Sequence, residues 1–220
     1  STSPCTVRAH AGSGQREAGQ VRVPVELWGV DEFGAERLHA RAQILLLGEK
    51  LPPAPPAGPR PRLAPYSAPE GGLYEERLFQ GPRLRGIEEV TGSSEEGLEA
   101  RVRCAPLAST WMREPPRFDW IADPLALDCA FQLLILWCLE RFGQASLPAG
   151  LASYRQFARR FPAQGVLVRA RITRQEGAQV RADIDFLDTQ GQLVARIEGY
   201  ACVMDAGLRE AFRKRVVCEA

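Results

Sequence analysis

One stretch of the sequence, residues 123–142, has the pattern of a long helix that is apolar on almost every side. Asp123 can cap its first turn, and Pro124 fits the first helical position, where its missing N–H costs nothing. Apolar residues then follow on essentially every face. Because a helix that is apolar all round must be buried, we expect the neighbouring segments to form a sheet that wraps round it.

Two polar residues interrupt this apolar helix. Asp128 and Gln132 are four positions apart, so they project from the same side, one turn from each other. Burial disfavours the charged form of a carboxyl group and raises its pKa, which suits a proton donor near neutral pH. The alternative is structural: backbone donors satisfy the carboxylate, and the amide bonds across the core. Spacing alone leaves both open and favours the structural role.

Alternating apolar and polar residues on both sides of the helix predict β-strands. Residues 21–44 have the pattern of a hairpin with one buried face, and residues 73–79 could form a helical turn. The order of strands, one helix and more strands predicts an α+β fold. The remaining predicted strands are residues 83–91, 98–104, 166–174, 180–187 and 193–203.

A proline-rich stretch divides the chain. Residues 51–69 contain eight prolines, so we expect them to run extended over the surface as a linker. The hairpin at residues 21–44 also resembles the pattern at residues 180–200, which suggests an internal repeat with an incomplete first copy. We therefore expect four parts: residues 1–50 with hairpin strands, the linker 51–69, the helix-bearing part 70–204, and a basic C-terminal helix or linker at 205–220.

Composition argues against several classes of function. The 28 Lys and Arg against 27 Asp and Glu give a net charge of +1, which creates no field to attract nucleic acid or an acidic membrane surface. The longest apolar run is far shorter than the ~20 residues that span a bilayer. The six cysteines form no C-x-x-C pair, and only His10 and His39 could help them bind a metal. We expect no metal site, reduced thiols and a cytoplasmic protein.

Two segments resemble the dehydratase domains of polyketide synthases. LYEERLFQGPRLRGIEEV resembles the segment with an aromatic-x-Gly-Pro-x-aromatic motif, and DPLALDCAFQ resembles the Asp-x-x-x-Gln/His motif. Leu147 and Pro148 lie where the family has a Leu-Pro motif. The resemblance covers roughly residues 21–203 and is strongest to the dehydratase-like domains of bacterial polyunsaturated fatty acid synthases and iterative polyketide synthases.

The resemblance implies a double-hotdog fold, in which each of two repeats wraps an antiparallel sheet round a long helix. Residues 1–50 would be a partial first hotdog and residues 70–204 the second. It also implies a dehydratase, in which a histidine of the first hotdog removes the α-proton of a 3-hydroxyacyl chain. An acid, here Asp128, protonates the departing hydroxyl, and a trans-2-enoyl thioester and water result. Gln132 would hold the acid or the hydroxyl.

The same resemblance implies partners and a substrate tunnel. The acyl chain would be carried on the phosphopantetheine of an acyl carrier protein, with no other cofactor and no metal. Neighbouring synthase domains would be further partners, and homodimerisation stays open. Apolar residues near the motifs are candidates for the acyl tunnel, with core packing as the alternative. These are Tyr74, Phe79, Pro82, Phe131 and Trp137.

The sequence departs from the family pattern at several points. Neither histidine lies in the family's His-x-x-x-Gly-x-x-x-x-Pro motif, and Leu84 stands where an aromatic residue is usual. The chain is then either a fragment, which we favour, or a degenerate domain that no longer dehydrates. Two other functions stay open. One is a catalytically inactive hotdog module for scaffolding, dimerisation or carrier docking, and the other is a product-template-like cyclase.

Overall fold

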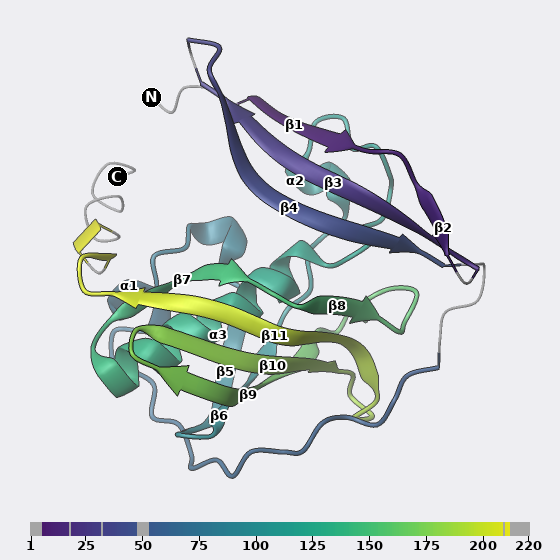
Figure 1. The fold of residues 1–220 in the computed structure, drawn as a ribbon. Coiled ribbons are helices and arrows are strands. Elements are labelled where there is room, and N and C mark those ends of the chain that lie inside the picture. Colours follow the sequence, from purple (N-terminus) through teal and green to yellow (C-terminus); the bar gives the residue numbers. More distant parts are fainter. Residues whose placement is uncertain (1–5, 18, 32, 48–52, 209, 212–220) are drawn as a thin grey trace. The chain divides into compact units, whose positions relative to one another are not determined.

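The computed structural model describes residues 6–17, 19–31, 33–47, 53–208 and 210–211 of the 220. The chain divides into two compact units, Ser1–Pro52 and Pro53–Ala220, called unit 1 and unit 2 below. Each unit has an antiparallel sheet of its own (Figure 1). Among the helices of the described residues, none is both long and apolar enough to cross a membrane.

Unit 1 is a four-stranded sheet in which β3 pairs with all three other strands. The predicted hairpin is confirmed, since β3 and β4 pair from Val21 with Leu46 to Val30 with Glu36. No helix occurs among its described residues, so the predicted buried face stays partly open, and Ile44 is 45% exposed. The strands are β1 (Thr6–Ala11), β2 (Gln15–Glu17), β3 (Gln20–Val30) and β4 (Glu36–Leu46).

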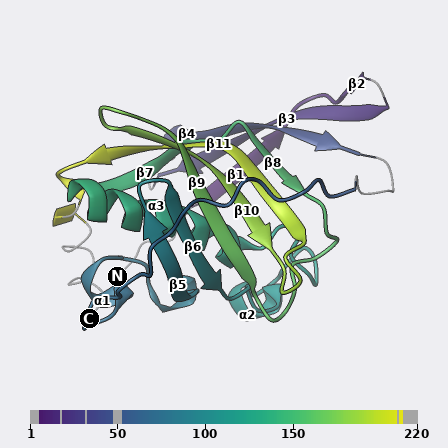
Figure 2. The ribbon, with the colours of Figure 1, turned by 90° about the horizontal axis from the view of Figure 1, so that it is seen from below.

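Unit 2 is a seven-stranded sheet that curves round one long helix, α3 (Pro124–Phe142), as Figures 1 and 2 show. The strand order is β5-β6-β9-β10-β11-β7, with β8 also paired to β11. Every pairing is antiparallel. The strands are β5 (Ile87–Ser94), β6 (Gly97–Val102), β7 (Ala145–Gly150), β8 (Ser153–Gln156), β9 (Val166–Glu176), β10 (Gln179–Leu187) and β11 (Leu193–Asp205).

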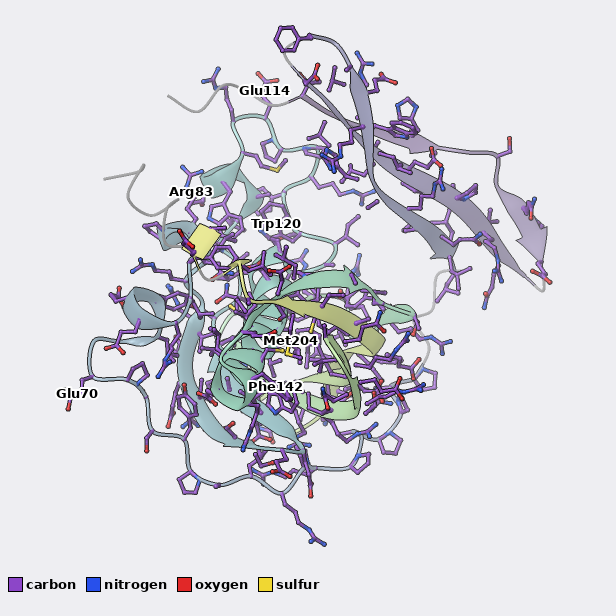
Figure 3. The ribbon with its side chains drawn as sticks, turned by 60° about the vertical axis from the view of Figure 1, so that its left-hand side comes forward. Glu70, Arg83, Glu114, Trp120, Phe142 and Met204 are labelled. Atoms are coloured by element: carbon purple, nitrogen blue, oxygen red, sulfur yellow. The ribbon has the colours of Figure 1, made fainter. Side chains whose placement is uncertain are left out.

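The predicted helix is confirmed, together with its Asp123 N-cap. The Asp123 side chain accepts a hydrogen bond from the backbone N–H of Ala126 at 2.8 Å, and Gly143 ends the helix with a φ of 66°. Twelve of its residues are buried, so α3 is the centre of the hydrophobic core. Phe142, the last residue of α3 and labelled in Figure 3, is exposed and packs edge-on against the buried Trp137.

The proline-rich stretch of unit 2 lies on the sheet. Figure 2 shows it crossing the strands in an extended path, as predicted. The carboxylate of Asp185 accepts hydrogen bonds from the Gly58 N–H at 2.6 Å and from Arg196 at 2.6 Å. The Arg60 side chain reaches the buried Glu99 at 2.9 Å. Two buried carboxylates therefore fasten this stretch to the outside of the sheet.

Some predicted elements were wrong in extent or missing. The strand predicted at 83–91 begins only at Ile87, because Pro82 opens a 3₁₀ turn, η1 (Pro82–Leu84), in which the Leu84 N–H bonds to Gly81. The strands β7 and β8 were not predicted, since β7 contains Pro148, a residue that sheets tolerate mainly at their edges. The helical turns are α1 (Leu73–Glu76) and α2 (Ala108–Trp111).

Replacing the buried carboxylate under the proline-rich stretch should destabilise unit 2. In Asp185→Ala, the Arg196 guanidinium keeps the Pro56 carbonyl but loses its carboxylate, and the Gly58 N–H loses its acceptor, which costs about 3 kcal/mol for a buried pair. Glu89→Ala removes a carboxylate from a solvent-exposed pair with Arg101 and should cost less than about 1 kcal/mol. Urea denaturation measures both free energies of unfolding, and equal losses would contradict the account.

Candidate active site

Asp128 and Gln132 meet on one side of α3, as their spacing predicts. The Gln132 side chain is fully buried, and its Nε2 donates to Asp128 Oδ2 at 2.6 Å and to the Leu84 carbonyl at 2.8 Å. The Tyr74 hydroxyl donates to Gln132 Oε1 at 3.0 Å and accepts from the Ile87 N–H at 2.9 Å. The amide therefore uses its donors and its acceptor, and it joins Asp128 to Leu84 and Tyr74 and, through the Tyr74 hydroxyl, to Ile87.

The two acids at the start of α3 lie in different surroundings. Asp123 is buried and accepts from backbone N–H groups of Ala105 and Ala126. Asp128 is half-buried and accepts from Gln132, and within the described part of the chain it bonds to no backbone donor. Backbone N–H groups therefore satisfy Asp123, whereas Asp128 Oδ1 has no hydrogen-bond partner in the described part of the chain.

Burial sets the protonation of this group. It raises the pKa of Asp128 above the ordinary value of 3.8, and the Gln132 N–H opposes this because it stabilises the carboxylate. The neighbouring Cys129 thiol is also buried, which raises its pKa to about 12 and keeps it neutral. Asp128 can therefore hold a proton to a higher pH than a solvent-exposed aspartate can.

Tyr74 is held in place by its hydroxyl group and by a cation at its ring. Its hydroxyl is engaged as described, and the Arg85 guanidinium lies 5.4 Å from the ring centroid. Arg85 is itself fixed by hydrogen bonds to Glu75 at 2.7 Å and to the Gln80 carbonyl at 3.2 Å. Burial raises the pKa of Tyr74, so its hydroxyl keeps its proton.

The other predicted tunnel residues are spread over unit 2. Phe79 is half-buried against the core, and Pro82 is exposed at the start of η1. Phe131 stacks on Tyr200 with ring centroids 5.0 Å apart. Trp137 is buried and donates to the Ser94 carbonyl, and nine helical positions place it roughly 13 Å along the axis from Asp128. The structure thus brings Tyr74 to the acid and leaves Trp137 at the other end of the helix.

Both histidines belong to unit 1. His10 lies in β1 and His39 in β4, and both are exposed. Sequence reasoning missed two groups of the site, the Leu84 carbonyl and the Ile87 N–H. Both belong to the backbone, so the residue type does not indicate them. Among the described residues, no group of three or more His, Cys, Asp or Glu side chains is placed to hold a metal ion.

The model of the polyketide synthase dehydratase N-terminal domain matches residues 52–206. A component of the polyunsaturated fatty acid synthase from Thraustochytrium sp. is 32% identical over 147 residues, which are 66% of this chain and 5% of that protein. The chain therefore spans a small part of this relative.

Solved structures show the same fold at low sequence identity. The dehydratase domain from the CurK module of the curacin polyketide synthase has a TM-score of 0.65 at 17% identity, covering 91% of this chain and 69% of that one. The dehydratase domain of RzxB from Pseudomonas fluorescens has a TM-score of 0.61 at 17% identity, covering 89% and 67%. The bifunctional dehydratase-cyclase domain of ambruticin biosynthesis has a TM-score of 0.61 at 19% identity, covering 91% and 69%.

These matches confirm the hotdog fold that the family resemblance implied, and the sheet wrapped round a helix that the sequence pattern predicted agrees with it. The family model covers more than half of the chain and includes the Asp128 helix. The chain therefore belongs to the dehydratase domain family of polyketide and polyunsaturated fatty acid synthases.

Proposed function

We propose that this domain eliminates water from 3-hydroxyacyl chains carried on an acyl carrier protein and yields trans-2-enoyl thioesters. Family membership supports the reaction type. The observation that carries the proposal is the Asp128 carboxyl group, which is half-buried, is held at Oδ2 by Gln132 and has no hydrogen bond at Oδ1 from the described residues. This is the arrangement that a proton donor to a leaving hydroxyl needs.

In the proposed reaction, a base removes the proton on C2 of the acyl chain, and the electrons of that C–H bond form the C2=C3 double bond. The C3–O bond breaks, and the hydroxyl leaves as water with the proton of Asp128. The resulting Asp128 carboxylate keeps its hydrogen bond from Gln132, which stabilises the new charge. Transfer of the C2 proton from the base to the carboxylate restores the starting state.

The base in this proposal is a histidine of the family motif. Two of the similar solved structures are described as inactive mutants in which a histidine is replaced by phenylalanine. The motif is absent from the 220 residues, so activity measurements use the chain joined to a dehydratase segment that carries it. We further assign unit 1 to part of a first hotdog and unit 2 to the second.

Membership of this synthase family supports an acyl carrier protein and neighbouring synthase domains as the proposed partners. In the proposal, the phosphopantetheine arm of the carrier is the one prosthetic group involved, and the synthase acts in the cytoplasm. Phe79, which packs against the core, and Phe131, which is three residues from Asp128 on α3, are the proposed contacts of the acyl chain. The inactive-module and cyclase alternatives are not favoured, because the matched family is that of dehydratases.

Removing the acid should abolish most of the turnover. Asp128→Asn keeps the shape and the bond to Gln132 but has no acidic proton, so we expect a loss of about 10²- to 10⁴-fold. Loss of water from a 3-hydroxyacyl carrier protein, followed by mass spectrometry, measures this. Asp123→Asn on the same helix is the matched control, because asparagine also caps helices and should retain turnover. Equal activity in the two variants would rule out Asp128 as the acid.

The pH dependence of turnover should report the same group. The reaction needs protonated Asp128, so the rate falls as pH rises through the folded-state pKa of this residue. Gln132→Leu removes the N–H that stabilises the carboxylate, raises this pKa further and moves the falling limb to higher pH. A limb that stays in place or moves to lower pH would contradict the assignment.

A further inference from the structure

The orientation of the Gln132 amide is determined by two backbone groups. The Leu84 carbonyl can only accept, so the Gln132 nitrogen must face it. The Ile87 N–H can only donate, so the Tyr74 oxygen must accept from it, and the single Tyr74 proton is left for Gln132 Oε1. The hydrogen-bond partners therefore identify which side of the Gln132 amide is the nitrogen and which is the oxygen. The nitrogen faces Asp128 and donates an N–H to it.

We propose that Tyr74 is a positioning residue that acts through Gln132 to keep the proton of Asp128 on Oδ1. Asp128 Oδ2 accepts the Gln132 N–H at 2.6 Å, and Oδ1 bonds to no residue in the described part of the chain. A protonated carboxyl group with one oxygen already receiving an N–H carries its proton on the other. The acidic proton is then on the oxygen that is free to meet a ligand.

This inference gives the Tyr74 hydroxyl a role different from lining an acyl tunnel. The role of the Oδ1 proton in catalysis rests on the proposed function. The hydrogen bonds that join Tyr74, Gln132 and Asp128 do not depend on it. Arg85 and the Ile87 N–H, which lie outside α3, fix the position of Tyr74. Tyr74 then orients the Gln132 amide, and that amide donates to Asp128. Loss of the Tyr74 hydroxyl leaves the fully buried Gln132 carbonyl without a donor and the Ile87 N–H without an acceptor.

Among the described residues, the titratable side chains near Asp128 carry no charge that would shift its pKa. Those that interact electrostatically with it are Tyr74 on α1, Cys129 on α3 and Tyr200 on β11. Burial raises the pKa of each, so all three are neutral at neutral pH. The Gln132 N–H is therefore the group through which a change at Tyr74 reaches the Asp128 carboxyl.

Titration of Asp128 tests the inference without any need for turnover. Selective ¹³C labelling of aspartate carboxyl groups gives the pKa by NMR, with Asp128→Asn to assign the resonance. Gln132→Leu should raise the Asp128 pKa by about one to two units, and Tyr74→Phe by about half a unit to one unit, since each weakens a hydrogen bond to the charged form. Tyr154→Phe is the matched control and should change nothing, because its hydroxyl donates to another glutamine, Gln156, at 2.7 Å.

An unchanged Asp128 pKa in folded Tyr74→Phe, alongside a shift in Gln132→Leu, would overturn the inference. A wild-type measurement covers the case in which Tyr74→Phe does not fold: the Gln132 side-chain N–H resonances should shift with the midpoint of Asp128, and their independence of pH would also overturn it. The two proposals fail separately. Shifts as expected, without dehydration by the histidine-containing chain, would leave the Tyr74 role standing and remove the dehydratase assignment.

Discussion

The burial of α3 is the constraint on which the rest of the structure depends. Because the helix is apolar on nearly every side, the sheet has to enclose it, and any polar group on it must find its partners inside the core. Gln132 is fully buried and meets this demand with three partners, Tyr74 and Leu84 from other segments and Asp128 one turn away on the same helix. The environment that makes Asp128 a strong candidate for an acid is the same environment that holds the fold together.

Two kinds of buried carboxylate in unit 2 show how surroundings decide the role of an acid. Asp185 and Glu99 are almost completely buried, and each is paired with an arginine, so they fasten the proline-rich stretch and the strands beneath it. Asp128 has no ion-pair partner in the described part of the chain, and an uncharged amide is its contact. Charge pairing favours the ionised form, whereas burial beside an amide leaves protonation accessible.

The sequence predicted much of the fold and part of the site. The apolar helix with its Asp-Pro start, and the alternation of most strands, predicted unit 2 nearly as it is. The i, i+4 spacing also placed Asp128 and Gln132 together. The hydrogen bonds of Tyr74 could not be predicted, because its partners are a backbone N–H and an amide from distant segments. Strand β7 was missed because a proline at an edge hides the pattern.

The central claim is that burial gives Asp128 a proton at a pH where an exposed aspartate has lost it. Infrared difference spectra between the wild-type protein and Asp128→Asn isolate the C=O stretch of the protonated carboxyl group at this one position, and its intensity can be followed against pH. The account predicts a midpoint above the ordinary aspartate value of 3.8. A midpoint at or below that value would show an ionised carboxylate held by Gln132, and Asp128 could then not be the acid.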